Sequence, residues 1–186
     1  MEAKPVTYGG VSFRSTLEFR WSVFFDCLKV KWLYEPQSFS VGGSGYIPDF
    51  WLPEYESFVE IKPVLVGLRI DKPIALAEKV KVAVLVGKPM PGIISWFGFP
   101  GKKSNYYHSE FGFCRKCERM MLCVKPSAKI WLPVLMPATE CRHSFIESSC
   151  LDSFPMLHLS FIRALAESRK SSNSCGVTDD GKEMQE

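Results

Sequence analysis

The chain has 186 residues, enough for one buried core and a small appended module, and its net charge of +3 does not by itself argue for a nucleic-acid-binding protein. Any DNA-binding surface must therefore come from local clusters of charge. The sequence has no apolar run long enough to span a membrane, residues 1–10 lack the order of a secretory signal, and the odd number of seven cysteines indicates a reducing, cytoplasmic setting.

The first predicted element is a helix over residues 11–29. Ser15 and Glu18 have the spacing of a capping box, in which a hydroxyl and a carboxylate satisfy amides at the start of a helix. Apolar residues then recur at helical spacing and predict a buried stripe: Leu17, Trp21, Phe24, Phe25 and Leu28.

Strands and one short helix are predicted between this helix and residue 90. In chain order they are a strand at 30–35, a turn at 41–45, a strand at 46–52, a turn at 53–57, a strand at 58–62, a helix at 74–81, a strand at 82–86 and a break at 87–89. Only about five residues separate the second and third strands, so we expect them to pair as a hairpin. The order α-β-β-β-α-β predicts an α/β or α+β core.

Three charged residues lie where the second and third predicted strands would meet. Alternate residues of a strand point to one face, so Glu60 and Lys62 project together, and a hairpin brings Asp49 beside Glu60. Two close carboxylates repel unless a cation lies between them, and Mg²⁺ or Mn²⁺ prefers such oxygen ligands. The Ile61 backbone carbonyl is a further candidate ligand. The alternative is a strand-end aspartate beside a solvated, opposite-charge pair.

A metal ion held in this place would suit the hydrolysis of a phosphodiester bond. The ion would lower the pKa of a bound water and neutralise charge on the phosphate oxygens. Lys62 would position the attacking water or hold the phosphate. Glu18 would reach the same cluster as an additional ligand or water holder, and its alternative role is the capping box alone.

The pattern of Asp49 followed by Glu60-X-Lys62 resembles the signature of the PD-(D/E)XK nuclease superfamily, and Glu18 matches the helical glutamate of many members. The order of further blocks is similar to that in the phage endonuclease I group of junction resolvases and in related small phage nucleases. These blocks are Phe13-Arg14-Ser15, Leu17-Glu18, Tyr34-Glu35, Tyr46, Pro48-Asp49-Phe50, Leu52-Pro53 and Val59-Glu60-Ile61-Lys62. The resemblance covers residues 11–90.

The resemblance implies a restriction-endonuclease-like fold over residues 1–100, with a mixed β-sheet flanked by helices. It also implies a DNA endonuclease that uses Mg²⁺ or Mn²⁺, in the host cell if the chain is phage-encoded. Among DNA substrates it favours branched or junction DNA. Nucleases that cut both strands often act in pairs, so a homodimer is expected. The alternative is a non-catalytic nucleic-acid-binding or assembly module with the same fold.

Three basic residues are candidate DNA contacts, with ordinary surface positions as the alternative: Arg14, Lys102 and Lys103. Residues 101–167 are predicted to form a cysteine-containing C-terminal extension, with a helix from residue 156. Residues 168–186 are rich in serine and charged residues and predict a disordered tail.

Cysteines of the predicted extension suggest a structural zinc site. Cys114 and Cys117 have the spacing of one zinc knuckle, and zinc needs four ligands. Cys141 with His143 is the best second pair, and Cys123 or Cys150 could substitute. The alternatives are free buried thiols or, for the chain as a whole, a zinc-stabilised interaction protein.

Overall fold

The computed structural model describes residues 6–64, 69–90, 92–102, 105–114, 119–127, 130–135, 151–152 and 166–167. Its elements in chain order are β1 (Val6–Tyr8), β2 (Val11–Phe13), α1 (Thr16–Cys27), β3 (Leu33–Tyr34), β4 (Phe39–Val41), β5 (Ser44–Tyr46), β6 (Phe50–Leu52), the 3₁₀ helix η1 (Pro53–Tyr55), β7 (Ser57–Lys62), α2 (Asp71–Ala77), β8 (Val82–Val86), β9 (Gly92–Gly98), β10 (Asn105–Cys114), β11 (Met120–Ser127), β12 (Ile130–Leu135) and β13 (Leu151–Asp152). Among the described helices, none is long and apolar enough to cross a membrane.

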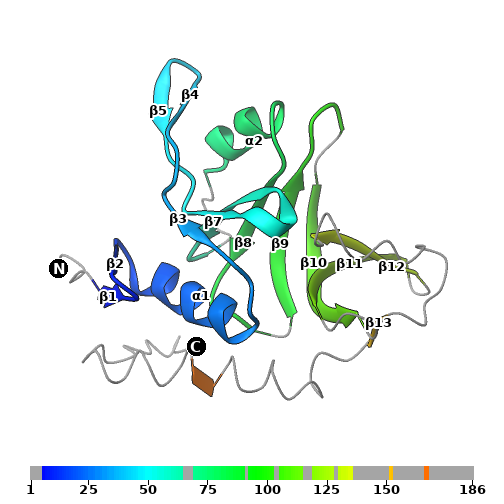
Figure 1. Cartoon of the computed structure of the whole chain (residues 1–186). Helices are drawn as coiled ribbons and strands as arrows, with labels where there is room; N and C mark the ends of the chain where they lie inside the picture. Colours follow the sequence, from blue (N-terminus) through cyan, green and yellow to red (C-terminus); the bar gives the residue numbers. More distant parts are fainter. Residues whose placement is uncertain are drawn as a thin grey trace, which may run out of the picture.

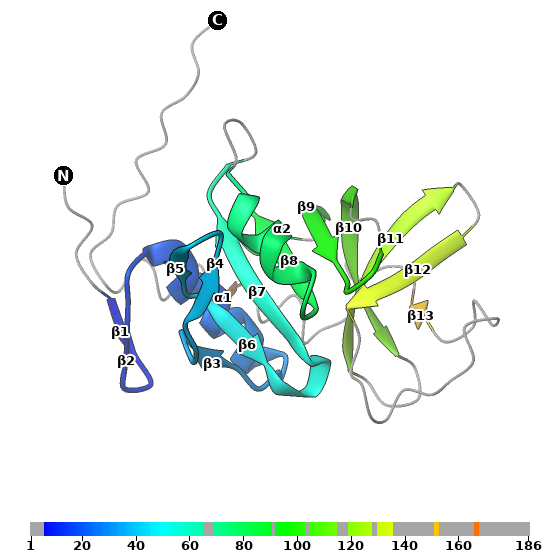
Figure 2. The same cartoon turned by 90° about the horizontal axis from the view of Figure 1, so that it is seen from above.

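One mixed sheet dominates the described part of the chain. Its strands follow the order β12-β11-β10-β9-β8-β7-β6-β3, and β13 pairs with β10. Strands β7 and β8 are parallel, whereas β6–β7 and β8–β9 are antiparallel. Figure 2 shows the sheet running from β6 and β7 through β8 toward β12. The predicted mixed α+β architecture is confirmed at this level.

The two helices cover opposite faces of the sheet. The apolar stripe of α1, including Trp21 and Phe24, packs with Phe50, Val59 and Leu85 in the larger core cluster. The α2 residues Leu76 and Ala77 belong to a second cluster with residues of the other face: Phe58, Val82, Val84 and Trp96. Because side chains alternate along β7, this division assigns Val59 and Ile61 to the α1 face and Phe58 and Glu60 to the α2 face.

The predicted order α-β-β-β-α-β is present as α1-β3-β6-β7-α2-β8. The expected β6–β7 hairpin forms, with Phe50 opposite Val59 and Leu52 opposite Ser57. Helix α2 connects the parallel pair β7 and β8 across the face that it covers. Hairpin β4–β5 is an addition between β3 and β6, and Figure 1 shows it projecting beside α2.

Two short hairpins, β1–β2 and β4–β5, were not predicted from the sequence. Gly9 and Gly10 have φ of 57° and 80° and join β1 to β2, so residues 11–13 are a strand and not the start of the helix. Gly42 and Gly43 have φ of 56° and 76° and join β4 to β5 in the same way. Two consecutive residues with positive φ form the tight turn whose twist suits a β-hairpin, and glycine adopts it without steric cost.

Several predicted boundaries were also wrong. Helix α1 begins at Thr16 because the Ser15 side chain caps it, accepting from the Glu18 amide at 3.1 Å. The strand expected over 46–52 is divided between β5, which ends at Tyr46, and β6, which begins at Phe50. Helix α2 lies a few residues earlier than its predicted range of 74–81.

The sheet continues past the domain boundary predicted at residue 100. Strand β9 pairs with β10 over six registered positions, and Phe111 and Leu122 join the core cluster that contains Phe24. The division into a 1–100 core and a 101–167 extension stays a prediction. Of the helix expected from residue 156, residues 166–167 are described and helical, and the tail at 168–186 lies outside the described residues.

Candidate active site

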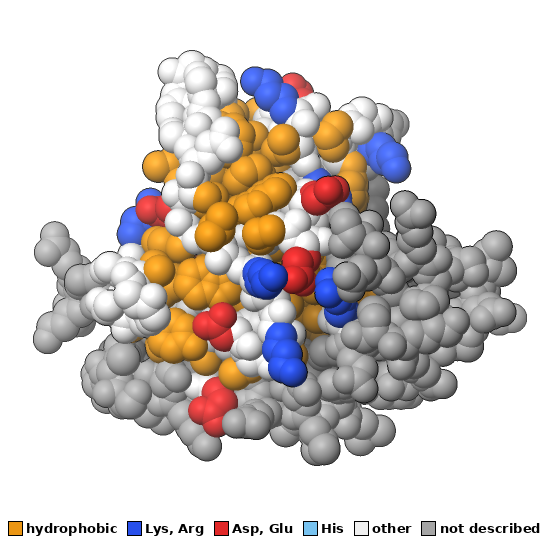
Figure 3. All heavy atoms as spheres, in the orientation of Figure 1, with side chains coloured by type: hydrophobic (Ala, Val, Ile, Leu, Met, Phe, Trp, Pro, Cys, Tyr) orange, Lys and Arg blue, Asp and Glu red, His pale blue; other side chains and the backbone are white. Residues whose placement is uncertain are grey.

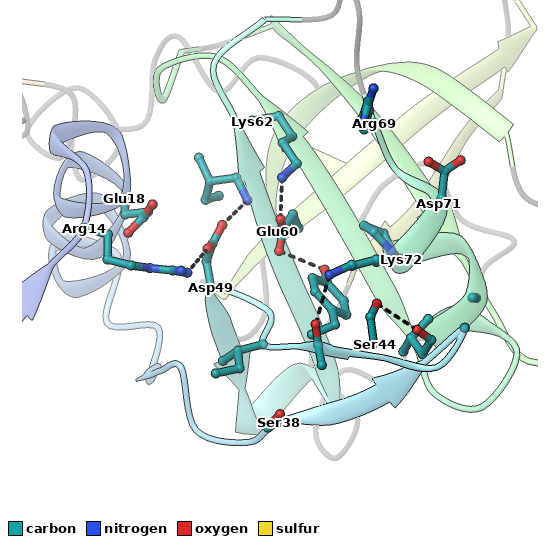
Figure 4. A pocket seen from close by; sticks show the side chains of 18 residues that line it. Arg14, Glu18, Ser38, Ser44, Asp49, Glu60, Lys62, Arg69, Asp71 and Lys72 are labelled. Atoms are coloured by element: carbon teal, nitrogen blue, oxygen red, sulfur yellow. Dashed lines mark hydrogen bonds and ion pairs between the residues drawn. The ribbon is translucent and has the colours of Figure 1, made fainter. Parts of the chain in front are cut away.

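The strand ends of β6 and β7 carry the acidic residues that the sequence singled out. Asp49 directly precedes β6, and Glu60 and Lys62 lie on β7. Phe50 is paired with Val59, so the next step of the antiparallel register places Asp49 beside Glu60. Both side chains belong to the face of the sheet that α2 covers, and Figure 4 shows them converging on one pocket.

Asp49 is a buried carboxylate with 4% of its surface exposed. Its Oδ2 accepts a hydrogen bond from the Ile61 amide at 2.7 Å, and its Oδ1 lies 3.5 Å from Arg14 Nη2. Burial and, next, the charge of Glu60 raise the pKa of Asp49 to about 8, although the Ile61 hydrogen bond opposes the shift. Without a further cation, Asp49 therefore takes up a proton near neutral pH.

Glu60 is also buried, with 6% exposure, and both of its oxygens have partners. Tyr46 Oη donates to Oε2 at 2.8 Å, and Lys62 Nζ donates to Oε1 at 2.5 Å. Burial, followed by the charge of Glu60, raises the pKa of the Tyr46 hydroxyl, so this group remains a donor. The hydroxyl and the ammonium together fix the orientation of the Glu60 carboxylate.

Glu18 enters the same pocket from the first turn of α1. Its Oε2 accepts a hydrogen bond from Tyr34 Oη at 2.5 Å. Burial and this hydrogen bond raise the pKa of Tyr34 to about 12. Of the predicted capping box, the Ser15 half is present, because the Ser15 hydroxyl accepts from the Glu18 amide, whereas the Glu18 carboxylate bonds to Tyr34 and is directed to the pocket (Figure 4).

Arg14 connects two carboxylates at the edge of the site. Its guanidinium pairs with Glu35 and lies near Asp49. Glu35 has a φ of 45°, a conformation that costs a non-glycine residue about 1 kcal/mol or more. In that conformation the Glu35 amide bonds to the Asp49 carbonyl at 2.9 Å. The backbone beside Asp49 is thus held from β3 as well as from β7.

These residues line one end of a pocket of about 1170 Å³. Hairpin β4–β5 forms one wall, and residues at the start of α2 form the opposite wall. Charged residues from four parts of the chain face the pocket: Arg14, Glu18, Asp49, Glu60, Lys62, Arg69, Asp71 and Lys72. An extended anionic ligand would therefore meet cations along the pocket as well as the acidic cluster.

The chemistry of the oxygen donors suits a hard divalent cation. Asp49 and Glu60 are adjacent buried carboxylates, and a positive charge between them would oppose both causes of the raised Asp49 pKa, the burial and the charge of Glu60, by favouring the charged form. The Ile61 amide faces Asp49, and the carbonyl of a strand residue points to the same neighbour as its amide. Among the described residues, however, no three acidic, histidine or cysteine side chains lie close enough to form a ligand cluster. Asp49 and Glu60 are thus the two side chains that fit a divalent cation, and Glu18 lies farther from this pair.

The predicted site residues have different outcomes. The pocket brings together six of them: Arg14, Glu18, Asp49, Glu60, Ile61 and Lys62. Lys102 lies elsewhere and is exposed, with its Nζ 6.0 Å from the centre of the Phe99 ring. Cys114 ends β10, whereas Lys103, Cys117, Cys141 and His143 lie outside the described residues, so the zinc site stays a prediction.

Four residues of the site were not assigned a role from the sequence: Tyr34, Tyr46, Arg69 and Lys72. The tyrosines hold Glu18 and Glu60, and the two cations line the far end of the pocket. Tyr34 and Tyr46 occur in the sequence blocks that carry the family resemblance, which was the available signal for them. No local pattern distinguishes Arg69 or Lys72 from ordinary surface cations.

Comparisons of the chain with protein-family models, with curated proteins and with solved structures found no match.

Proposed function

We propose that this chain is a divalent-metal-dependent endonuclease of the PD-(D/E)XK type that hydrolyses phosphodiester bonds in DNA. The observation that carries the proposal is the adjacency of two buried carboxylates, Asp49 and Glu60, with the Lys62 ammonium beside them in an accessible pocket. Burying like charges together costs stability unless a cation or a proton offsets their repulsion, and such costly pairs cluster at functional sites. The α1-β3-β6-β7-α2-β8 order supports a restriction-endonuclease-like core.

Each side chain of the site has a role that follows from its chemistry. Asp49 and Glu60 would hold Mg²⁺ or Mn²⁺, with the Ile61 carbonyl and Glu18 as supporting oxygens. When bound, the ion supplies an activated water and neutralises charge on the phosphate. Lys62 Nζ lies next to Glu60, where it would attract the phosphate and orient the attacking water. Tyr46 keeps Glu60 turned toward Lys62.

The proposal has a direct test. Purified protein with Mg²⁺ or Mn²⁺ is incubated with labelled single-stranded, duplex and four-way-junction DNA. We expect cleavage that is lost on chelation and that falls by about a hundredfold or more in Asp49→Ala, Glu60→Ala and Lys62→Ala. Glu78→Gln and Lys79→Ala are matched controls, because both residues are exposed and lie outside the pocket. Full activity in the three site variants contradicts the proposal.

Three further expectations, on the DNA substrate, the oligomeric state and the zinc site, have tests of their own. Preference for the four-way junction would support branched DNA as substrate. Sedimentation of the protein with and without DNA measures the expected homodimer. Zinc analysis of the purified protein tests the separate prediction for Cys114, Cys117, Cys141 and His143.

A non-catalytic nucleic-acid-binding or assembly module is the second candidate. One observation favours it: the acidic cluster is satisfied without metal, since Tyr46 and Lys62 occupy both oxygens of Glu60 and the Asp49 pKa is about 8. Calorimetry separates the two functions. A nuclease binds Mg²⁺ at a site that Asp49→Ala removes, whereas a binding module binds DNA with no such metal site.

A further inference from the structure

The pocket extends well beyond the acidic cluster, into an arm between hairpin β4–β5 and the start of α2. The arm is lined by Ser38, Val41, Gly42, Ser44 and Gly45 on the hairpin side and by Arg69, Asp71, Lys72, Pro73 and Ala75 on the helix side. Metal binding by Asp49 and Glu60 uses none of these residues. The arm is therefore available to the part of a substrate that flanks the reacting phosphate.

Two cations of the arm differ from the cations of the acidic cluster. Arg14 and Lys62 are each ion-paired with a carboxylate. Arg69 and Lys72 have no ion pair within the part of the chain that the structure describes, and Lys72 Nζ donates instead to the neutral Gly45 carbonyl at 2.9 Å. A solvated ammonium that is not paired with a carboxylate is ready to bind an anion.

Asp71 is the one carboxylate among these arm residues. Its charge, after burial, contributes to raising the pKa of the Tyr106 hydroxyl on β10, which shows that Asp71 is also close to that strand. Two cations against one carboxylate leave the arm with a positive balance. Figure 3 shows that charged side chains on the visible face are otherwise scattered and of both signs. The excess of positive charge in the arm is therefore a local feature of the pocket.

The shape of the arm limits what can enter it. Gly45 on the hairpin and Lys72 on α2 are joined by a hydrogen bond, so the two walls approach closely at this point (Figure 4). A single strand, with one phosphate per nucleotide and free base edges, can run between such walls. A duplex has a second, paired strand beside the first and therefore needs a wider space than a single strand does.

We propose that this arm binds an unpaired nucleic-acid strand next to the cleaved bond, with Arg69 and Lys72 contacting backbone phosphates. This inference deepens the proposed nuclease function and rests on it for the position of the cleaved bond. Contacts to backbone phosphates carry no sequence information, so we expect the binding to be insensitive to sequence. Positive grooves that follow the backbone are the usual basis of such binding.

The binding test uses chelated protein, so it does not depend on catalysis. The affinity of the protein for a labelled oligothymidylate of eight nucleotides is measured by fluorescence anisotropy at 50–200 mM salt. Two phosphate contacts contribute a slope of about 1.4 in log K against log salt, so over this range the wild type loses about sevenfold more affinity than Arg69→Ala/Lys72→Ala. Lys79→Ala, which removes an exposed lysine outside the pocket, keeps the wild-type slope. Equal slopes in wild type and double variant overturn the inference.

Two further measurements complete the test. Lys72→Arg keeps the positive charge and should keep the wild-type affinity, whereas Lys72→Gln should lower it. Both replacements can still donate to the Gly45 carbonyl, so this difference separates phosphate binding from a structural role of that contact. A duplex of the same length should compete at least tenfold more weakly than the single strand; equal competition overturns the assignment to unpaired strands.

Cleavage then separates this inference from the function on which it rests. With Mg²⁺, Arg69→Ala/Lys72→Ala should lower kcat/KM for the oligonucleotide about tenfold and leave hydrolysis of bis-p-nitrophenyl phosphate unchanged, because that small diester has no flanking phosphate. Lys62→Ala should impair both reactions. If neither substrate is hydrolysed but the salt slopes differ, the nuclease proposal fails and the strand-binding arm stands; an equal loss on both substrates refutes the arm as a flanking-phosphate site.

Discussion

The raised pKa of Asp49 predicts an unusual pH dependence of stability. An ordinary aspartate titrates near 3.8, and the buried Asp49 titrates near 8. Between these values the folded protein holds a proton that the unfolded chain has released. The free energy of unfolding should therefore fall as pH rises through this window, the opposite of the behaviour of a salt-bridged aspartate.

The size of the effect follows from the shift. One pKa unit corresponds to about 1.4 kcal/mol, so a single group with this shift lowers the unfolding free energy by about 2–3 kcal/mol between pH 5 and pH 7. Asp49→Asn keeps the shape of the side chain and removes its titration. The stability of the variant relative to wild type should rise by that amount over the same interval.

Urea unfolding of chelated protein at pH 5, 6, 7 and 8 measures this difference, and Glu78→Gln controls for the loss of one exposed carboxylate. Adding Mg²⁺ should flatten the wild-type curve, because an ion between Asp49 and Glu60 favours the charged form, and should leave Asp49→Asn unaffected. Parallel curves for wild type and Asp49→Asn would refute the account of a desolvated acidic pair. If the wild-type and Asp49→Asn curves differ but Mg²⁺ does not change the difference, the buried acidic pair is supported and the metal site is refuted.

Three further predictions concern single contacts, and each is measured as a change in the urea midpoint. Tyr46→Phe removes the donor to Glu60 from a site where Tyr46 is 8% exposed, so it should destabilise the protein by about 1–3 kcal/mol; an unchanged midpoint would mean that the bond is not made. Ser15→Ala removes the cap of α1 and should cost about 1 kcal/mol, whereas Ser15→Asp should retain most of the stability. Gly98→Ala places a methyl group against Ala77 and the Trp96 ring, so it should cost about 1–3 kcal/mol, and a neutral result would show that β9 and α2 are packed less closely than described.

Local sequence patterns predicted the parts of the fold in which neighbours along the chain are also neighbours in space. The apolar stripe of α1, the β6–β7 hairpin and the buried strand β8 follow from periodicity and short connections. The same two-residue period placed Glu60 and Lys62 on one face, and their 2.5 Å contact agrees with that expectation. The Gly9-Gly10 hairpin was predictable by the same reasoning, since a glycine pair is a hairpin signal, but its second strand, residues 11–13, was included in the expected helix.

The sequence by itself thus determined which carboxylates would meet at the ends of β6 and β7, because a strand repeat and a short turn leave little freedom. Only the tertiary structure decided what surrounds them. Tyr34 and Tyr46 hold the acidic residues from β3 and from the β4–β5 hairpin, and Arg69 and Lys72 line the pocket from the segment before α2 and from α2 itself. Such contacts depend on how separate elements pack, and each element can satisfy its own local pattern in many packings. The burial that raises the pKa of Asp49 to about 8 belongs to this second kind, since residues of separate elements surround this side chain, among them Ile61 of β7 and Arg14 before α1.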